Sequence, residues 1–169
     1  MRHGVLSPPR RLRRLPAIVL LTVSAVLVLA GCSTSPPTVT FDVAGNSLTA
    51  APTQFCDNEM QNCNDDANAR LTAQLPPGTP VKVTVPEEVS SAPWQVAFSY
   101  LGPDGRTRTD GRSPIAAPGS RTDFTLTLPD PRDRLLTAQV QLFGPAPTRD
   151  PASGQISFPV RATWVLVAA

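Results

Sequence analysis

The three cysteines, Cys32, Cys56 and Cys63, are the residues whose type and spacing best fit a defined chemistry. A thiol can carry a lipid, form a disulfide or bind a metal ion. The only histidine, His3, lies before all three, so no imidazole follows Cys32. Catalytic triads and dyads that use a histidine base are therefore excluded from residues 33–169, and we predict that the protein is not an enzyme.

The first 31 residues have the pattern of an export signal. An uncharged apolar run covers residues 17–30, and five arginines precede it: Arg2, Arg10, Arg11, Arg13 and Arg14. As a helix this run would span roughly 21 Å, which is short of the ~30 Å hydrocarbon core of a bilayer. We therefore expect a cleaved signal peptide over residues 1–31 rather than a permanent transmembrane helix.

The end of the apolar run, Leu29-Ala30-Gly31-Cys32, resembles the bacterial lipobox. In that motif the cysteine thiol receives a diacylglyceryl group and the chain is cut just before it. The resemblance implies that Cys32 is the lipidated first residue of the mature protein, held on the extracytoplasmic face of the cell membrane. An uncleaved signal anchor and a conventionally cleaved secreted protein are the alternatives. Two acyl chains anchor a protein stably, whereas one chain is marginal.

The positive net charge of the chain belongs to the export signal. Five of the 15 Lys+Arg residues precede Cys32, whereas all 13 Asp+Glu residues follow it. The formal charge of +2 therefore becomes −3 after cleavage. Binding to nucleic acid needs clustered basic residues on the folded domain, so we predict no nucleic-acid partner.

Cys56 and Cys63 are a closely spaced pair in a chain that we expect to be exported. Such a pair favours a local disulfide. The alternative is a metal site that uses nearby carboxylates, from Asp57, Glu59, Asp65 and Asp66. The spacing fits no zinc pattern and lacks the glycine of a calcium loop, so we predict the disulfide, no bound metal and no cofactor.

Apolar and polar residues alternate with period two through most of the chain after the cysteine at position 32. This alternation predicts half-buried strands. The segments are 38–43, 70–75, 81–85, 94–100, 124–128, 136–142 and 156–166. Their phase places Trp94 and Trp164 in the core, and it also turns Leu136, Ile156 and Phe158 inward. Pro159 indicates an edge position or a bulge in the last segment.

These segments predict an all-β fold, an immunoglobulin-like antiparallel β-sandwich of about seven to eight strands over residues 38–169. All but three of the 20 prolines follow Cys32, which leaves room for only a single helical turn at 86–91. Residues 32–37 are then the lipidated cysteine and a short tether. Pro103-Asp104-Gly105 predicts a hairpin turn.

The segment from Val85 to Trp94, Val-Pro-Glu-Glu-Val-Ser-Ser-Ala-Pro-Trp, followed by Val96, Phe98 and Tyr100, resembles a family of actinobacterial lipoproteins known as domain of unknown function 2771. The lipobox and the Cys56/Cys63 pair also resemble that family. The family has no assigned activity, so the resemblance implies a location and a fold and transfers no catalytic residue.

Paired carboxylates are the remaining catalytic candidates, because two acids suffice to cleave a glycosidic bond. Glu87 and Glu88 fit the start of a helix, where acidic residues favour the dipole. Asp130 and Asp133 fit a turn. We predict no catalytic role for these four residues.

Arg106, Arg108 and Arg112 are the basic cluster of the predicted domain. One interpretation is a solvated hairpin balanced by Asp104 and Asp110. The other is contact with anionic lipid headgroups or with an acidic envelope polymer, which the short tether encourages.

The sequence thus predicts a membrane-anchored envelope lipoprotein whose sandwich is a non-enzymatic binding module. Its partners are the membrane, through the lipid anchor, and an envelope protein, lipid or glycan that the sequence does not identify. A carrier or sensor of a lipid or glycan, with a cavity between the sheets, is the alternative.

Overall fold

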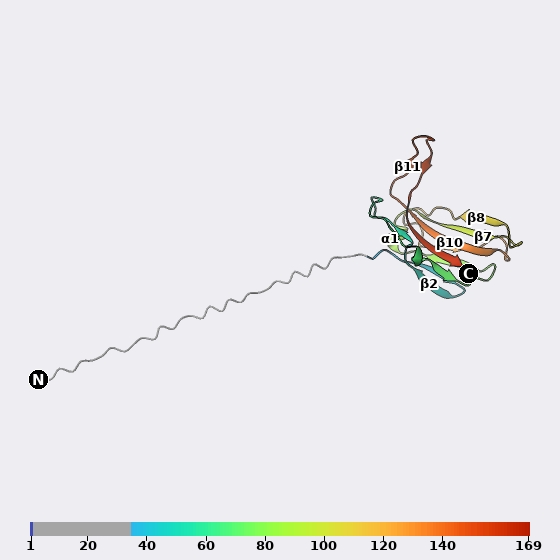
Figure 1. Cartoon of the computed structure of the whole chain (residues 1–169), viewed down its shortest axis with the longest axis horizontal. Coiled ribbons are helices and arrows are strands. Elements are labelled where there is room, and N and C mark those ends of the chain that lie inside the picture. The colour runs from blue at the N-terminus through green and yellow to red at the C-terminus, as the bar shows by residue number, and fades with distance from the viewer. Residues whose placement is uncertain (2–34) are drawn as a thin grey trace. The chain divides into compact units, whose positions relative to one another are not determined.

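The computed structural model describes residue 1 and residues 35–169, and the second range forms two β-sheets that share one hydrophobic core (Figure 1). The predicted all-β sandwich is confirmed. The predicted signal peptide and Cys32 lie outside the described residues. In the described part, no helix is long and apolar enough to cross a membrane.

The smaller sheet has four antiparallel strands in the order β2-β1-β6-β9. These are β2 (Asn46–Ala50), β1 (Val39–Val43), β6 (Val81–Thr84) and β9 (Asp123–Leu126). Alternate residues of β1 and β6 are fully buried, as the period-two pattern predicts. The short segment β2 is mostly exposed because it lies at the edge of the sheet.

The larger sheet has seven strands, six of them in the order β4-β3-β13-β10-β7-β8. They are β4 (Asn64–Asp65), β3 (Gln54–Phe55), β13 (Val160–Ala168), β10 (Arg134–Phe143), β7 (Trp94–Leu101) and β8 (Arg108–Arg112). The seventh, β5 (Leu71–Ala73), pairs with β13 in parallel, whereas we predicted only antiparallel pairing.

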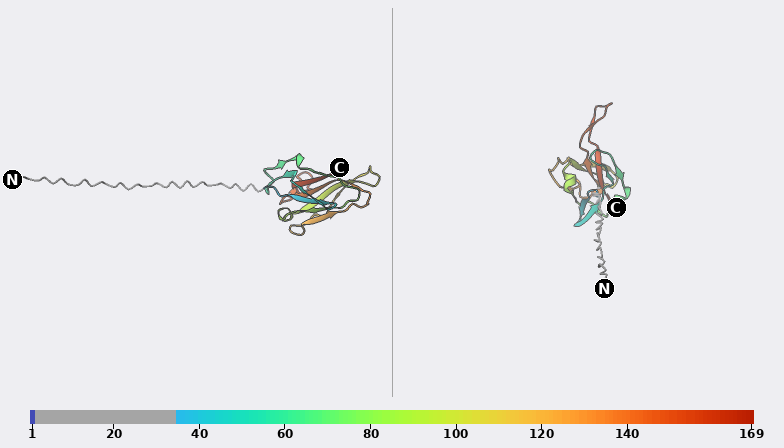
Figure 2. Two further views of the ribbon diagram at one scale, coloured as in Figure 1. Left: turned by 90° about the horizontal axis from the view of Figure 1, so that it is seen from below. Right: turned by 90° about the vertical axis from the view of Figure 1, so that its left-hand side faces the viewer.

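The remaining elements are short. The helical turn α1 (Glu87–Ser90) confirms the predicted turn after Pro86, and η1 (Ala67–Ala69) is a 3-10 turn. Strands β11 (Thr148–Arg149) and β12 (Ile156–Ser157) pair in a hairpin that stands out from the sandwich (Figure 2). The described residues therefore contain 13 strands rather than seven or eight, because two-residue strands such as β3 and β4 are too short to show apolar alternation.

The core lies between the two sheets and contains both tryptophans. Trp94 is 1% exposed and Trp164 is 0% exposed, which confirms their predicted positions. They pack with inward-facing residues of both sheets, including Phe41, Val83 and Val140. A sandwich needs this arrangement because each sheet is apolar on one face only.

The predicted phase is wrong at two places where a strand pairing changes register. Between Leu135 and Thr137 the β7–β10 pairing shifts, so Leu135 is buried and Leu136 is only half-buried. A one-residue shift moves a side chain to the other face of a strand. Sequence periodicity does not reveal such a shift when both neighbouring residues are leucine.

Pro159 ends the alternation of the last predicted strand. Ile156 and Phe158 precede it and are exposed, whereas Ala162 and Trp164 follow it and are buried. The β10–β13 pairing shifts register between Leu142 and Phe143, opposite this point, so the predicted bulge is confirmed. The predicted edge position is wrong, because β13 lies between β10 and β3.

Candidate functional site

The outward face of the larger sheet is polar along its three long strands. Because side chains alternate between the two faces of a strand, the residues between core positions all point away from the core. Strand pairing then places Ser99, Thr137 and Val167 in one row, and Ala97, Gln139 and Val165 in the next. A third row contains Gln95, Gln141 and Thr163.

Hydrogen bonds between neighbouring strands hold many of these polar side chains. Gln95 Nε2 donates to Gln141 Oε1 at 2.8 Å, and the hydroxyls of Ser99 and Thr137 lie 2.9 Å apart. The Thr163 hydroxyl lies 2.7 Å from that of Thr53. The face is therefore ordered before any ligand binds, which lowers the entropy cost of binding.

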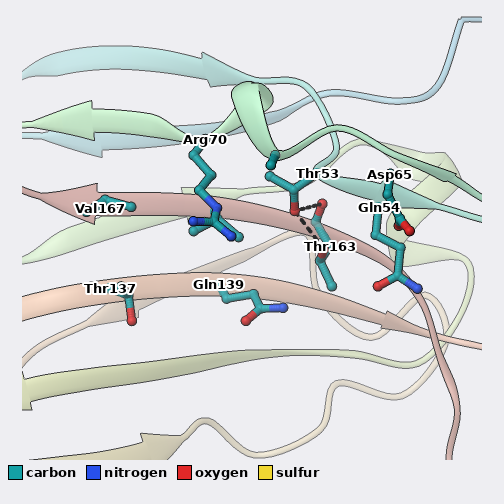
Figure 3. A pocket seen from close by; sticks show the side chains of 10 residues that line it. Thr53, Gln54, Asp65, Arg70, Thr137, Gln139, Thr163 and Val167 are labelled. Atoms are coloured by element: carbon teal, nitrogen blue, oxygen red, sulfur yellow. Dashed lines mark hydrogen bonds between the residues drawn. The ribbon is translucent and has the colours of Figure 1, made fainter.

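Two hollows on this face share lining residues, and we call the two together the groove. One has a volume of about 480 Å³ and the other of about 240 Å³, and Thr137 and Gln139 line both. Figure 3 shows these two side chains on β10, beside Thr163 and Val167 of β13. The Gln139 side chain makes no hydrogen bond to another described residue, so its amide is free to bind a ligand.

One wall of the groove comes from the segment before β5. It is formed by Thr53, Gln54, Asp65, Ala67 and Arg70. Arg70 is exposed and extends over β13, as Figure 3 shows. Gln54 and Asp65 face each other in the β3–β4 pairing.

A disulfide closes the loop that joins β3 and β4. Cys56 and Cys63 are bonded, as predicted, with their Cα atoms 4.0 Å apart. The disulfide staples the β3–β4 hairpin, which also carries Gln54 and Asp65. The local bridge therefore holds one wall of the groove, although neither cysteine lines it.

Two of the four carboxylates near the disulfide accept hydrogen bonds from neighbouring residues of the chain. Asp57 accepts hydrogen bonds from the Gln61 amide at 2.6 Å and from Asn62 Nδ2 at 2.7 Å. Asp66 accepts one from the Asn68 amide at 2.9 Å, at the start of η1. No group of three or more histidine, cysteine or acidic residues in the described ranges is arranged to hold a metal ion.

The opposite wall of the groove is β8 at the edge of the sheet. Arg108, Asp110 and Arg112 line it, so the structure places two of the three predicted arginines at the groove. Arg108 Nε lies 3.3 Å from Asp110 Oδ1, in an exposed ion pair of the kind that contributes little to stability. Arg106 is exposed in the turn that precedes β8 and does not line the groove.

Three aspartates gather at the end of the sandwich that carries the β7–β8 turn. Asp104, Asp130 and Asp133 line a hollow together with Tyr100. Hydrogen bonds from the Thr107 side chain and from the Thr107 and Arg106 amides lower the pKa of Asp104 to about 2. Hydrogen bonds from Arg132 likewise lower the pKa of Asp130 to about 2. Neither carboxyl can act as the protonated acid of a glycosidase at neutral pH.

The start of the described chain is fixed to the sandwich. Trp164 Nε1 donates a hydrogen bond to the Pro37 carbonyl oxygen at 2.9 Å. Ser35, Pro36 and Pro37 line a hollow at α1 and the β3 end, with Phe55 and Ser91. Pro37, which we expected in the tether, therefore contacts the core.

Sequence reasoning missed Arg70, Gln139 and Thr163 as groove residues. They lie on or beside three different strands, and their proximity follows from strand order, which period-two alternation does not specify. Alternation does predict that Gln139 and Thr163 point away from the core. That partial signal identifies the face but not the groove.

Comparisons with known proteins agree with the family resemblance. The family described as "Protein of unknown function (DUF2771)" matches residues 33–169. An uncharacterised protein of Mycobacterium bovis is 28% identical over 149 residues, which cover 84% of this chain and 85% of the relative. Uncharacterised proteins of two Mycobacterium tuberculosis strains match with the same identity and coverage. No solved structure matches. The match over residues 33–169 shows that this chain belongs to the DUF2771 family of proteins of unknown function.

Proposed function

We propose that this protein is a lipid-anchored protein of the cell envelope whose sandwich binds an anionic glycan, without catalysis, in the groove across the larger sheet. The single observation that carries the binding role is the groove itself. It combines amide and hydroxyl groups with walls that carry three arginines and two aspartates. Such groups suit the hydroxyls and carboxylates of an extended polysaccharide.

The charged side chains of the groove sum to a formal +1, because its three arginines outnumber Asp65 and Asp110 by one, and this excess favours an anionic ligand over a neutral one. Arg70 stands on one wall and Arg112 on the other, and the structure contains no ion pair for either of them among the described residues. Guanidinium groups bind carboxylates with paired hydrogen bonds. The floor between them has small apolar residues, Ala97, Val165 and Val167, which leave room for a flat ring.

The absence of catalysis is part of the proposal. No histidine follows Cys32, and the aspartates at the β7–β8 end, Asp104 and Asp130, have lowered rather than raised pKa values. A glycan-cleaving pair needs one carboxyl that stays protonated at the working pH. These two carboxyls also lie outside the groove.

The alternative of a carrier with a cavity between the sheets is disfavoured by the packing of the core. Inward-facing side chains such as Phe41, Val96 and Trp164 belong to one packed cluster and are 0% exposed. The groove is lined by outward-facing residues instead. We therefore favour a surface binding module.

The lipid anchor rests on the lipobox at Cys32 and is tested separately. We expect mass spectrometry of the protein from bacterial membranes to show a chain that begins at Cys32 with a diacylglyceryl group on its thiol. Replacement of Cys32 by Ala should release the protein from the membrane fraction. An unmodified Cys32 in membrane-extracted protein would remove the anchor from the proposal.

Binding in the groove is tested with soluble peptidoglycan fragments, which carry both sugar hydroxyls and carboxylates. The mature protein in detergent should bind them in isothermal titration calorimetry. The double variant Arg70→Ala/Arg112→Ala should weaken binding by roughly tenfold or more, since a charged hydrogen bond contributes about 1.5–3 kcal/mol.

Arg121→Ala is the matched control, because Arg121 is also exposed and lies outside the groove. It should leave the affinity unchanged. Equal affinities for all three proteins, or no binding by the parent protein, would contradict the proposed ligand class.

A further inference from the structure

Three large hydrophobic side chains are exposed on the described part of the chain after residue 34. They are Ile115 (51% exposed), Ile156 (54%) and Phe158 (49%), and we call them the apolar end patch. Ile156 and Phe158 are two residues apart in an extended segment and so point to the same side. Phe158 and Ile115 line one hollow of about 270 Å³ whose walls are apolar throughout.

The patch is anchored to the sandwich by aromatic packing. The Phe158 ring meets Phe143 edge to face, with the ring centroids 6.1 Å apart. Phe143 is buried at the end of β10, and its amide donates to the Pro93 carbonyl at 3.0 Å. The Phe158 side chain is therefore fixed against a buried residue of β10, although about half of it stays exposed.

The apolar end patch lies at the end of the sandwich where the described chain begins. The hollow beside Ser35–Pro37 includes Ser91 and Arg161. Ser91 is two residues before Pro93, which lines the apolar hollow, and Arg161 is three residues after Phe158. Figure 1 shows α1 and the β11 hairpin at this same end of the sandwich.

The chain between Cys32 and the sandwich is short. Three peptide steps separate Cys32 from Ser35, which allow at most about 11 Å. Pro37 is already bound to Trp164. A lipid on Cys32 would therefore bring this end of the sandwich, and not another, to the membrane surface.

The patch end also carries exposed charged residues, Glu88 beside the Ser35–Pro37 hollow and Arg149, which pairs with Ile156. The opposite end differs because none of its described residues is an exposed large hydrophobic one. Its turns carry exposed charged residues, namely Asp104, Arg106, Arg108 and Arg132. β7 runs from the end with the patch at Trp94 to the opposite end at Leu101, which separates the two by roughly 23 Å at about 3.3 Å per residue. Arg106 and Arg108 are therefore far from the surface to which Cys32 would be attached.

We propose that the apolar end patch, Ile115, Ile156 and Phe158, inserts into the bilayer and sets the orientation of the sandwich on the membrane. This inference rests on the proposed lipid anchor at Cys32. In this orientation the long strands stand away from the membrane, and the groove opens to the side. A ligand can then run along the membrane surface and still reach Arg70 and Gln139.

The experiment places a tryptophan in the patch and measures its quenching by lipid. Phe158→Trp and Ile156→Trp proteins are reconstituted, with their native anchor, into phosphatidylglycerol–phosphatidylcholine vesicles with and without brominated acyl chains. The native Trp94 and Trp164 are buried, so they contribute a constant background. We expect a blue-shifted emission and a loss of intensity with brominated lipid for both variants.

Arg106→Trp at the opposite end is the matched control, and its emission should be the same in both kinds of vesicle. Unquenched emission from both patch variants in the vesicle fraction would overturn the proposal and leave a protein partner as the cover for the patch. Quenching of Arg106→Trp as strongly as the patch variants would also overturn it.

The same samples show whether a negative result comes from the insertion proposal or from the proposed lipid anchor. Intact mass reports whether Cys32 carries a lipid. If it does not, the anchor proposal fails, and the variants are held at the vesicle by a histidine tag before Ser33 on nickel-chelating lipid. Quenching in that arrangement supports insertion of the apolar end patch into the bilayer, independently of the lipid on Cys32. The absence of quenching overturns the proposed insertion.

Discussion

The Trp164 indole nitrogen donates a hydrogen bond to the Pro37 carbonyl oxygen at 2.9 Å, across 127 residues of sequence. Trp164 is fully buried in β13, so this bond connects the core directly to the residues that follow the predicted lipid anchor. The position of the chain start on the sandwich is thus determined by a core residue. The end of the domain that we propose to face the membrane is inferred from that contact.

Replacement of Trp164 by Phe should remove this bond while keeping an aromatic ring. The Pro37 carbonyl then loses its partner, and we expect the free energy of unfolding to fall by about 1–3 kcal/mol. Urea unfolding measures the loss, and hydrogen exchange should show faster exchange of the amides around Val39. Trp94→Phe, which loses a longer bond of 3.3 Å to the Arg121 carbonyl, should leave those amides protected.

Removal of the disulfide should weaken ligand binding at a distance. The double variant Cys56→Ser/Cys63→Ser opens a short loop. We expect its free energy of unfolding to fall by about 2.5 kcal/mol, as the chain-entropy model of disulfides predicts. The β3–β4 hairpin then loses its staple, so Gln54 and Asp65 no longer keep one wall of the groove in place. Calorimetry with peptidoglycan fragments should show weaker binding, and unchanged affinity would contradict the role of the loop in the groove.

The ring of Phe98 occupies the space that a side chain at position 111 would need, so this position requires glycine. A Cβ atom at Gly111 would lie 2.5 Å from Phe98 Cζ and 2.6 Å from Cε2. Gly111→Ala should therefore displace the half-buried ring and lower the free energy of unfolding by about 1–2 kcal/mol. Urea unfolding checks this, with Gly102→Ala as the control, because a Cβ there meets no atom closer than 3.6 Å. Phe98→Leu should recover part of the loss in the double variant.

The stability of the domain should fall below pH 4 because of two turn aspartates. Hydrogen bonds from Thr107 and Arg106 lower the pKa of Asp104 from 3.8 to about 2, and those from Arg132 lower the pKa of Asp130 equally. A pKa that is lower in the folded state than in the unfolded state stabilises the fold above the unfolded value. That stabilisation is present above about pH 4 and is lost as the pH falls through about 2.

Urea unfolding between pH 2 and pH 6 tests this dependence on Asp104 and Asp130. The double variant Asp104→Asn/Asp130→Asn should be less stable than the parent at pH 6 and should lose less stability toward pH 2. Parallel pH profiles for the two proteins would show that these carboxyls do not contribute.

The strands that could be predicted from sequence are those with a regular apolar alternation. β1 and β6 fall within predicted segments, β7 extends one residue beyond its segment, and the tryptophans are buried where their phase places them. Prediction failed at Leu136 and Phe158, where register shifts and Pro159 interrupt the alternation. Edge strands such as β2 were missed because edge positions bury few side chains.

The sequence by itself determined the absence of histidine after Cys32, the Cys56–Cys63 pair and the two-faced strands, and it predicts the export signal and the lipobox. These features can be read from the sequence because each depends only on residue types and spacings within a short stretch of the chain. Only the tertiary structure decided that Arg70, Gln139 and Arg112 border one groove, and that Phe158 lies at the end where Ser35 begins. Alternation specifies which face of a strand a side chain occupies, but the neighbours across strands follow from strand order and register, which depend on packing over the whole core.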